Sequence, residues 1–204
     1  MEQISHALFW ISNGLLVPVI VLLLLLLLRA LLLLGGFFGE FYQRMKLQKT
    51  LAELLEAMTP DNARGQLSLL PEPRNHPLLR SLKKLEEHDR DAAYCERLLA
   101  NYEVDAEKEL GRSRMFVKLG PMLGLMGTLI PMGPALVSLA GGDISSMAYN
   151  MQVAFATTVV GMLIAAIGVI TLQIKQRWYA REWNDLEFVY RKLSEEDEKK
   201  PVVA

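Results

Sequence analysis

The chain has 204 residues, 51% of them hydrophobic, and a formal net charge of −1 at pH 7. Because the hydrophobic residues gather in three blocks instead of recurring periodically, the composition favours a membrane protein over a soluble globular domain. The near-neutral charge gives no reason to expect a nucleic-acid partner, and the single cysteine, Cys95, excludes an internal disulfide.

The first hydrophobic block runs from Phe9 to Leu34. About 20 mainly apolar residues suffice to cross a hydrocarbon core of about 30 Å. No basic residue precedes this run, which is too long for a secretory signal, and no small-x-small cleavage site precedes Glu40. We therefore expect residues 1–36 to form an N-terminal stub and a retained first span. Arg29 is interpreted as a boundary residue whose side chain snorkels to the inner headgroups; the alternative is a functional intramembrane charge.

A long polar region, residues 37–115, separates the first and second blocks. The apolar spacing from Phe41 to Met58 predicts that the first helix continues beyond the membrane. Proline and other breakers between residues 59 and 77 predict a hinge or hairpin connection. A second helix is expected to run without interruption from Leu78 to Met115. His76 and His88 lack clustered cysteines or other convergent ligands, so no metal site is expected.

The second and third spans are expected at Phe116–Leu139 and Tyr149–Ile174, within a transmembrane hairpin of residues 116–174. Because the connecting loop is short, the two spans should form an antiparallel pair. Residues 175–204 should form a cytoplasmic helix with a disordered tail from residue 195 onward. The predicted fold class is all-α: a polytopic membrane protein with three transmembrane helices extended by cytoplasmic helices.

Both C-terminal spans carry a stripe of small residues on one helical face. Such stripes let membrane helices pack closely, so we expect them to join the two spans and to hold a homo-oligomer. Pro131 cannot donate a hydrogen bond to the carbonyl of Gly127, which predicts a kink in mid-membrane. The stripe of the second span contains Gly120, Gly124, Gly127, Pro131, Pro134, Ala135 and Ser138, and that of the third contains Ala154, Thr158, Gly161, Ala165 and Gly168.

The main polar side chains at membrane depth are Thr128, Thr157 and Thr158. Two interpretations stay open: each hydroxyl bonds a carbonyl one turn back, or it lines a path for water and ions. Between residues 119 and 174, Asp143 in the outer loop is the one charged or histidine residue. A proton pathway through hydrocarbon usually needs a titratable group, which this chain cannot supply alone.

The basic residues indicate an orientation. Every Lys and Arg except Arg29 and Lys118 lies between residues 44 and 114 or after residue 174. By the positive-inside rule, the middle region and the C-terminus are cytoplasmic, whereas the N-terminus and the loop 140–148 face outward.

The segments GPMLGLMGTL (120–129) and AFATTVVGMLIAAIG (154–168), preceded by ERLLANYEVDAEKELGRSRM, resemble the MotA/TolQ/ExbB proton-channel family. The resemblance extends to the order of the spans, the long inner loop and the short outer loop. It implies an inner-membrane pentamer around two copies of a single-span partner of the ExbD/TolR type, whose membrane aspartate carries the proton. It also implies that Thr128 and Thr158 are pore threonines, a role that Thr157 could share.

Two departures from the family pattern concern Gln152-Val153, where a glutamate is usual, and Pro131 and Pro134, which replace less disruptive residues. The soluble region is shorter than that of flagellar MotA, which favours an ExbB-like role in energising outer-membrane uptake. The pattern favours H⁺ over Na⁺ as the ion.

The sequence is also compatible with other function classes. The main alternative is a non-conducting membrane scaffold or a permease-like subunit of a substrate transporter. An enzyme is not expected, because no intramembrane His, Lys or Asp could activate the threonines or Ser138, and the chain has no HExxH motif or phosphate loop. No cofactor is expected.

Overall fold

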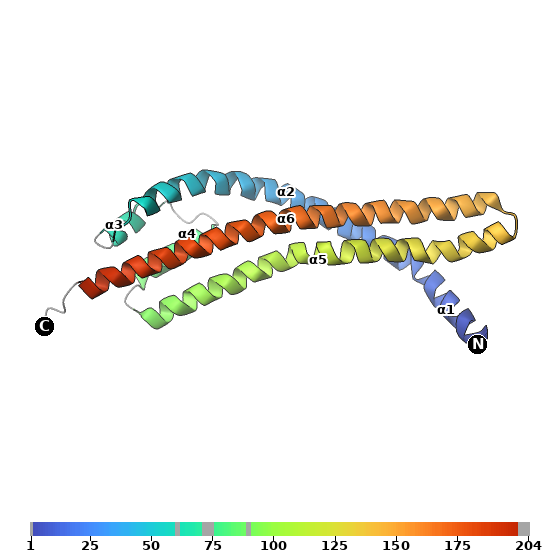
Figure 1. Cartoon of the computed structure of the whole chain (residues 1–204), viewed down its shortest axis with the longest axis horizontal. Coiled ribbons are helices and arrows are strands. Elements are labelled where there is room, and N and C mark those ends of the chain that lie inside the picture. Colours follow the sequence, from blue (N-terminus) through green and yellow to red (C-terminus); the bar gives the residue numbers. More distant parts are fainter. Residues whose placement is uncertain (1, 60–61, 71–75, 89–90, 200–204) are drawn as a thin grey trace. The chain divides into compact units, whose positions relative to one another are not determined.

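The computed structural model describes residues 2–59, 62–70, 76–88 and 91–199. Within these ranges the chain is all-α, without strands, and three of its helices are long and apolar enough to cross a membrane. This confirms the predicted fold class. The helices are α1 (Glu2–Gly14), α2 (Leu16–Glu56), α3 (Ala63–Leu67), α4 (Pro77–Glu87), α5 (Ala92–Ala140) and α6 (Ile144–Lys199) (Figure 1).

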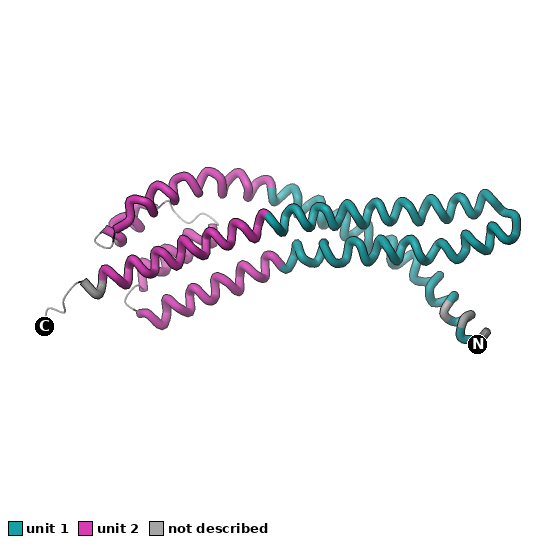
Figure 2. The backbone as a smooth tube through the Cα atoms, viewed as in Figure 1, with its two compact units in different colours: residues 1–37, 111–173 teal, residues 38–110, 174–204 magenta. Residues whose placement is uncertain are grey.

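The chain divides into two compact units, coloured separately in Figure 2. Unit 1 contains residues 1–37 and 111–173, and unit 2 contains residues 38–110 and 174–204. Helices α2, α5 and α6 each contribute residues to both units. Unit 1 holds the apolar parts of these three helices, whereas unit 2 holds α3, α4 and most of the charged residues.

The first hydrophobic block is divided between two helices, which the sequence analysis did not anticipate. Helix α1 ends at Gly14 and α2 begins at Leu16. Pro18 explains the break, because it has no amide hydrogen for the carbonyl of Gly14 and its ring crowds that carbonyl. The amide of Leu15 still donates to the carbonyl of Ile11 at 3.1 Å, so the turn remains hydrogen-bonded.

A tight turn joins α5 to α6 at the end of the hairpin in unit 1 (Figure 1). Gly142 has a φ of 76°, which favours glycine because it lacks a Cβ atom. Asp143 caps α6: its Oδ1 accepts from the amide of Ser146 at 3.0 Å and its Oδ2 from the hydroxyl of Ser146 at 2.5 Å. These hydrogen bonds lower the pKa of Asp143. The carboxylate in the turn between α5 and α6 therefore serves as a helix cap.

The core of unit 1 is small and apolar. Leu23 and Ala30 of α2 pack with Phe116 of α5 and with Ile164 and Ile167 of α6. Six other leucines of α2 are each at least 50% exposed: Leu22, Leu24, Leu25, Leu28, Leu31 and Leu32. An exposed apolar surface of this extent suits contact with lipid, where leucine is already solvated.

The core of unit 2 is built around α4. Four leucines on one face of α4 are buried: Leu78, Leu79, Leu82 and Leu85. Their spacing gives the amphipathic pattern of a surface helix, and they join a cluster that includes Leu51, Leu99 and Leu186. This cluster draws residues from α2, α3, α4, α5 and α6.

The predicted uninterrupted helix from Leu78 to Met115 is wrong. Helix α4 ends at Glu87, and α5 begins at Ala92; residues 89–90 lie outside the described residues. The physical reason is a new N-cap, since Oδ1 of Asp91 accepts from the amide of Tyr94 at 3.0 Å. The expected connection of residues 59–77 contains the short helix α3, and its residues 60–61 and 71–75 are also outside the described ranges.

The predicted disordered tail is wrong for residues 195–199. Helix α6 continues to Lys199, because Leu193 and Glu196 are buried and Lys192 forms an ion pair with Glu195 at 2.9 Å. Residues 200–204 lie outside the described part of the chain.

Candidate functional site

The two small-residue stripes face each other inside one chain, in the hairpin of unit 1. A Cβ atom added to Gly120 would lie 2.7 Å from the carbonyl oxygen of Gly161 and 3.0 Å from the amide nitrogen of Ala165. A Cβ added to Gly161 would lie 2.8 Å from Cα of Gly124. The α5 and α6 backbones are therefore in direct contact, which only glycine permits at these positions.

The close contact between α5 and α6 continues along the hairpin without a shift of one helix relative to the other. A Cβ on Gly127 would lie 2.6 Å from Cβ of Thr157, and a Cβ on Gly168 would lie 2.9 Å from Cβ of Phe116. The structure confirms that the stripes join the two spans within one chain. That these glycines also hold a homo-oligomer stays a prediction.

Thr157 lies inside the α5–α6 contact. Its side chain is 6% exposed and packs over Gly127. Its hydroxyl donates to the carbonyl of Ala154 at 2.8 Å. In this conformation the Thr157 hydroxyl is enclosed and already has an acceptor.

Thr128 and Thr158 are more accessible, because both are only partly buried. The hydroxyl of Thr128 donates to the carbonyl of Leu125 at 2.7 Å, and that of Thr158 lies 3.3 Å from the carbonyl of Ala154. The Thr158 bond is long for a hydroxyl donor and shares its acceptor with Thr157. Of the three threonines, Thr158 therefore has the hydroxyl that another acceptor or a water molecule would redirect most easily.

Pro131 lies on the packing face and is fully buried. Helix α5 continues through Pro131 and Pro134 to Ala140, so neither proline ends it. The stripe residues Pro134 and Ser138 are partly buried, whereas Ala135 is buried.

One buried polar contact of the hairpin was missed in the sequence. Ser113 and Thr171 are both 0% exposed, and their hydroxyl oxygens lie 3.3 Å apart. The hydroxyl of Thr171 also donates to the carbonyl of Ile167 at 2.8 Å. A signal was present in the sequence. Ser113 precedes Gly120 by two helical turns and Thr171 follows Gly168 by one, so each extends a stripe away from the turn at Gly142.

A second missed feature is a buried ionic cluster in unit 2, centred on Glu182 of α6. Arg44 of α2 donates to Oε1 of Glu182, and the hydroxyl of Tyr102 on α5 donates to Oε2. The guanidinium of Arg44 also lies 5.1 Å from the ring centroid of Trp178 and 5.0 Å from that of Tyr179. One carboxylate thus connects three helices through buried, charge-assisted hydrogen bonds.

Burial shifts the titration of this cluster. It raises the pKa of Glu182, against the opposing attraction of Arg44, and it raises the pKa of Tyr179 to about 12. Burial and the charge of Glu182 raise the pKa of Tyr102 well above its usual value. Tyr102 therefore stays protonated and acts as a hydrogen-bond donor.

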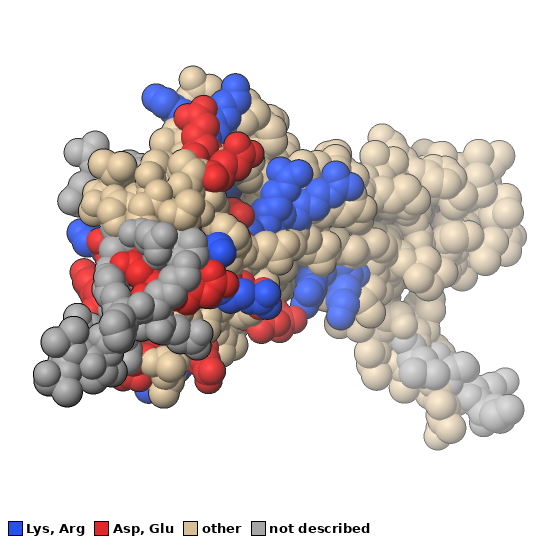
Figure 3. All heavy atoms as spheres, turned by 60° about the vertical axis from the view of Figure 1, so that its left-hand side comes forward, with Lys and Arg blue, Asp and Glu red and all other residues tan. Residues whose placement is uncertain are grey.

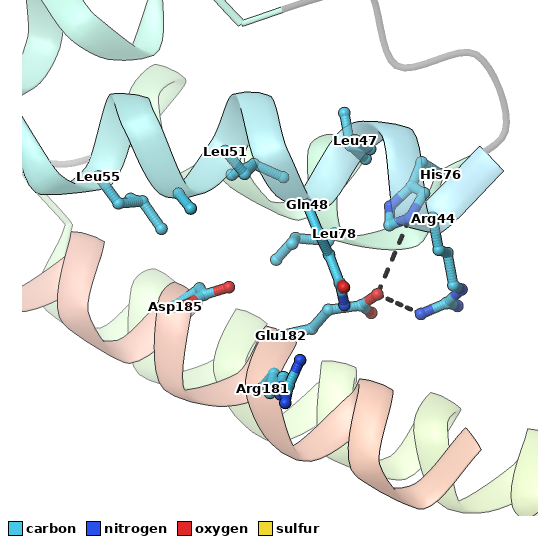
Figure 4. A pocket seen from close by; sticks show the side chains of 11 residues that line it. Arg44, Leu47, Gln48, Leu51, Leu55, His76, Leu78, Arg181, Glu182 and Asp185 are labelled. Atoms are coloured by element: carbon cyan, nitrogen blue, oxygen red, sulfur yellow. Dashed lines mark hydrogen bonds and ion pairs between the residues drawn. The ribbon is translucent and has the colours of Figure 1, made fainter. Parts of the chain in front are cut away.

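A cavity of about 210 Å³ lies beside the cluster (Figure 4). Leu47, Leu51 and Leu55 of α2 form its apolar wall, and His76 lies near Arg44 and Glu182 at one end. Nε2 of His76 is 3.8 Å from Oε1 of Glu182. Within the described residues, no group of three or more His, Cys, Asp and Glu side chains is arranged to hold a metal ion.

The chain was compared with known proteins. Residues 71–187, more than half of the chain, match the family model described as the MotA/TolQ/ExbB proton channel family. The match includes α4, all of α5 and the part of α6 that carries Thr157, Thr158 and Glu182. No curated protein matches the chain.

Proposed function

Because the chain belongs to the MotA/TolQ/ExbB proton channel family, we propose that it is an ExbB/TolQ-like subunit that couples the proton motive force to mechanical work. Family membership itself gives a proton-channel role in an oligomeric membrane assembly. Within that role, we propose that the work energises outer-membrane uptake and that the ion is H⁺.

One observation carries the proposal: the hairpin has no group that could carry a proton across the membrane. Between residues 119 and 174 the one charged residue is Asp143, which caps α6 in the outer turn. The hydroxyls of Thr128, Thr157 and Thr158 can orient water but cannot accept a proton near neutral pH. The carrier carboxylate must then come from another chain, and we assign it to a single-span partner of the ExbD/TolR type with a membrane aspartate.

The same observation argues against an enzyme. The span hydroxyls bond to main-chain carbonyls and have no neighbouring His, Lys or Asp in the hairpin sequence to activate them. We propose that the chain acts as a channel subunit without catalytic activity, and that it forms a homopentamer around the partner.

The distribution of charge supports an inner-membrane location with the C-terminus in the cytoplasm. In the face shown in Figure 3, the side chains of Lys, Arg, Asp and Glu gather on one part of the surface, and a large area has none of them. Except for Arg29 and Lys118, the Lys and Arg residues lie at 44–114 or after residue 174. By the positive-inside rule, unit 2 would be cytoplasmic and the turn at Gly142 would face outward.

The test is proton flux in liposomes. The chain alone should be nearly impermeable to protons, and co-reconstitution with its co-encoded single-span partner should produce flux. The measurement is dye-reported proton uptake driven by a potassium diffusion potential. Replacing the partner's membrane aspartate by asparagine should abolish uptake, since the amide keeps the size but cannot carry the charge.

Two results would contradict the proposal. Rapid uptake by this chain alone would show that the carboxylate is not needed. No uptake with any co-encoded partner would favour a non-conducting scaffold or permease-like subunit instead.

A further inference from the structure

His76 is buried at the start of α4 in unit 2. Its side chain is 12% exposed, and both ring nitrogens are buried without a hydrogen-bond partner in the described structure. Its carbonyl accepts from the amide of Arg80 at 3.2 Å, so His76 belongs to the first turn of α4. Buried polar atoms without partners are rare in native proteins and call for a physical explanation.

Each oxygen of the nearest carboxylate already accepts a charge-assisted hydrogen bond from another side chain. Nε2 of His76 lies 3.8 Å from Oε1 of Glu182, which accepts from Arg44, while Oε2 accepts from Tyr102. A protonated ring would share one carboxylate oxygen with a guanidinium (Figure 4). It would also present two N–H donors where neither now has an acceptor. The packed site therefore suits neutral His76 and disfavours its charged form.

Two carboxyl groups near His76 respond to acid in the opposite direction from His76. Burial raises the pKa of both Glu182 and Asp185, so their protonation favours the packed state. Burial and the charge of Arg44 lower the pKa of His76 from 6.5 to about 4, against the opposing effect of Glu40. The charged groups that line the cavity with His76 are Arg44 of α2 and Arg181, Glu182 and Asp185 of α6. Two more groups act on this site from outside the lining: the charge of Glu40 on α2 influences His76, and Tyr102 on α5 bonds to Glu182.

We propose that His76 is a proton-operated latch for α4. When neutral, it lets the first turn of α4 pack against α2 and α6; when it binds a proton, it releases that turn. Further along α4, Leu82 and Leu85 are fully buried in the apolar core of unit 2, so that part of the helix should stay packed longer. The latch acts within unit 2, so its test does not depend on proton flux through the spans.

The ordinary pKa of His76 and its lower pKa in the packed state set how strongly acid opens the first turn of α4. The packed state is fully favoured above pH 6.5, and that contribution is lost as the pH falls from 6.5 toward 4. Between pH 7.5 and 5.5, the protonation of His76 alone should raise the opening constant of the first turn of α4 about tenfold. Glu182 and Asp185 act in the opposite direction, so the contribution of His76 is the difference between the wild type and a variant that lacks the imidazole.

Hydrogen–deuterium exchange of the α4 amides measures this opening. The full chain is kept in lipid nanodiscs, and exchange rates at pH 7.5 and 5.5 are corrected for the intrinsic pH dependence. The key variant is His76→Asn, which keeps a polar side chain that cannot be charged. The matched control is His88→Asn, because His88 lies at the other end of α4 with an exposed ring stacked on Tyr94, 4.3 Å between centroids.

On going from pH 7.5 to 5.5, the change in the opening constant should be about tenfold larger in the wild type and in His88→Asn than in His76→Asn. The latch is refuted if His76→Asn shows the same pH dependence of opening as the wild type. If His76→Asn does not fold, the pKa of the His76 ring can be measured instead, by an NMR titration of the wild-type histidines. The chain has three histidines, so His6→Asn and His88→Asn assign the His76 signal by elimination. A His76 ring that titrates at or above 6.5 overturns the proposal, and one that titrates well below 6.5 supports it.

Discussion

Replacing Gly161 by alanine tests whether the α5 and α6 backbones are truly in contact. The new methyl group would lie 2.6 Å from the carbonyl oxygen of Gly120 and 2.8 Å from Cα of Gly124. Both neighbours are main-chain atoms, so the helices must separate by several tenths of an ångström. A gap of 0.5–1 Å forfeits roughly a quarter to a half of the dispersion energy of each separated atom pair, and overpacking of this kind costs about 1–3 kcal/mol.

The matched control is Gly111→Ala, also in a long helix of the hairpin. Nothing lies within 4 Å of the added Cβ there, so the substitution should be neutral or stabilise by up to about 1 kcal/mol through helix propensity. Unfolding in detergent by titration with sodium dodecyl sulfate, followed by circular dichroism, compares the two variants with the wild type. If Gly161→Ala unfolds at the same midpoint as the wild type, the inferred backbone contact is wrong.

Three further substitutions probe the hydroxyls and the buried cluster. Thr158→Val should leave assembly unchanged in native mass spectrometry and abolish proton uptake with the partner, whereas full uptake would leave Thr158 with only its bond to the helix. Thr171→Val should cost about 1–3 kcal/mol of hairpin stability, because it deprives the buried hydroxyl of Ser113 of its partner; the cost should shrink when Ser113 is also replaced by alanine. Arg44→Met should destabilise unit 2 by about 3–5 kcal/mol, because Glu182 would stay buried without a cation. Adding Glu182→Gln should recover a large part of that loss, and the absence of any recovery in a thermal unfolding series would argue against the pairing.

The features that sequence predicted well are those encoded by composition along one helix. Three apolar blocks suffice to predict three membrane helices, and the spacing of Gly120, Gly124 and Gly127 predicts a face for close packing. Composition could not predict which helix packs against that face. From sequence alone, the stripes suit contact within a chain and contact between chains equally well. In the structure they pack against each other within one chain, between α5 and α6.

The missed features divide into two kinds. Local signals were present for the break before α2 and the start of α5, since Pro18 and Asp91 act on neighbouring backbone groups. The cluster around Glu182 has no local signal. Arg44 and Glu182 are 138 residues apart in sequence, and a Glu in a charged helix ordinarily faces solvent. Only the folded packing of α2, α5 and α6 reveals that this one is buried.

The continuous α5–α6 contact in unit 1 also constrains how the chain can change in length. From the Gly127–Thr157 contact to the Ser113–Thr171 contact, both helices advance by fourteen residues. Deleting one residue from α5 between these points would rotate the remaining stripe by about 100° and shift it by about 1.5 Å, so that glycine would no longer face glycine. Length variation among relatives should therefore be absent from this part of the hairpin.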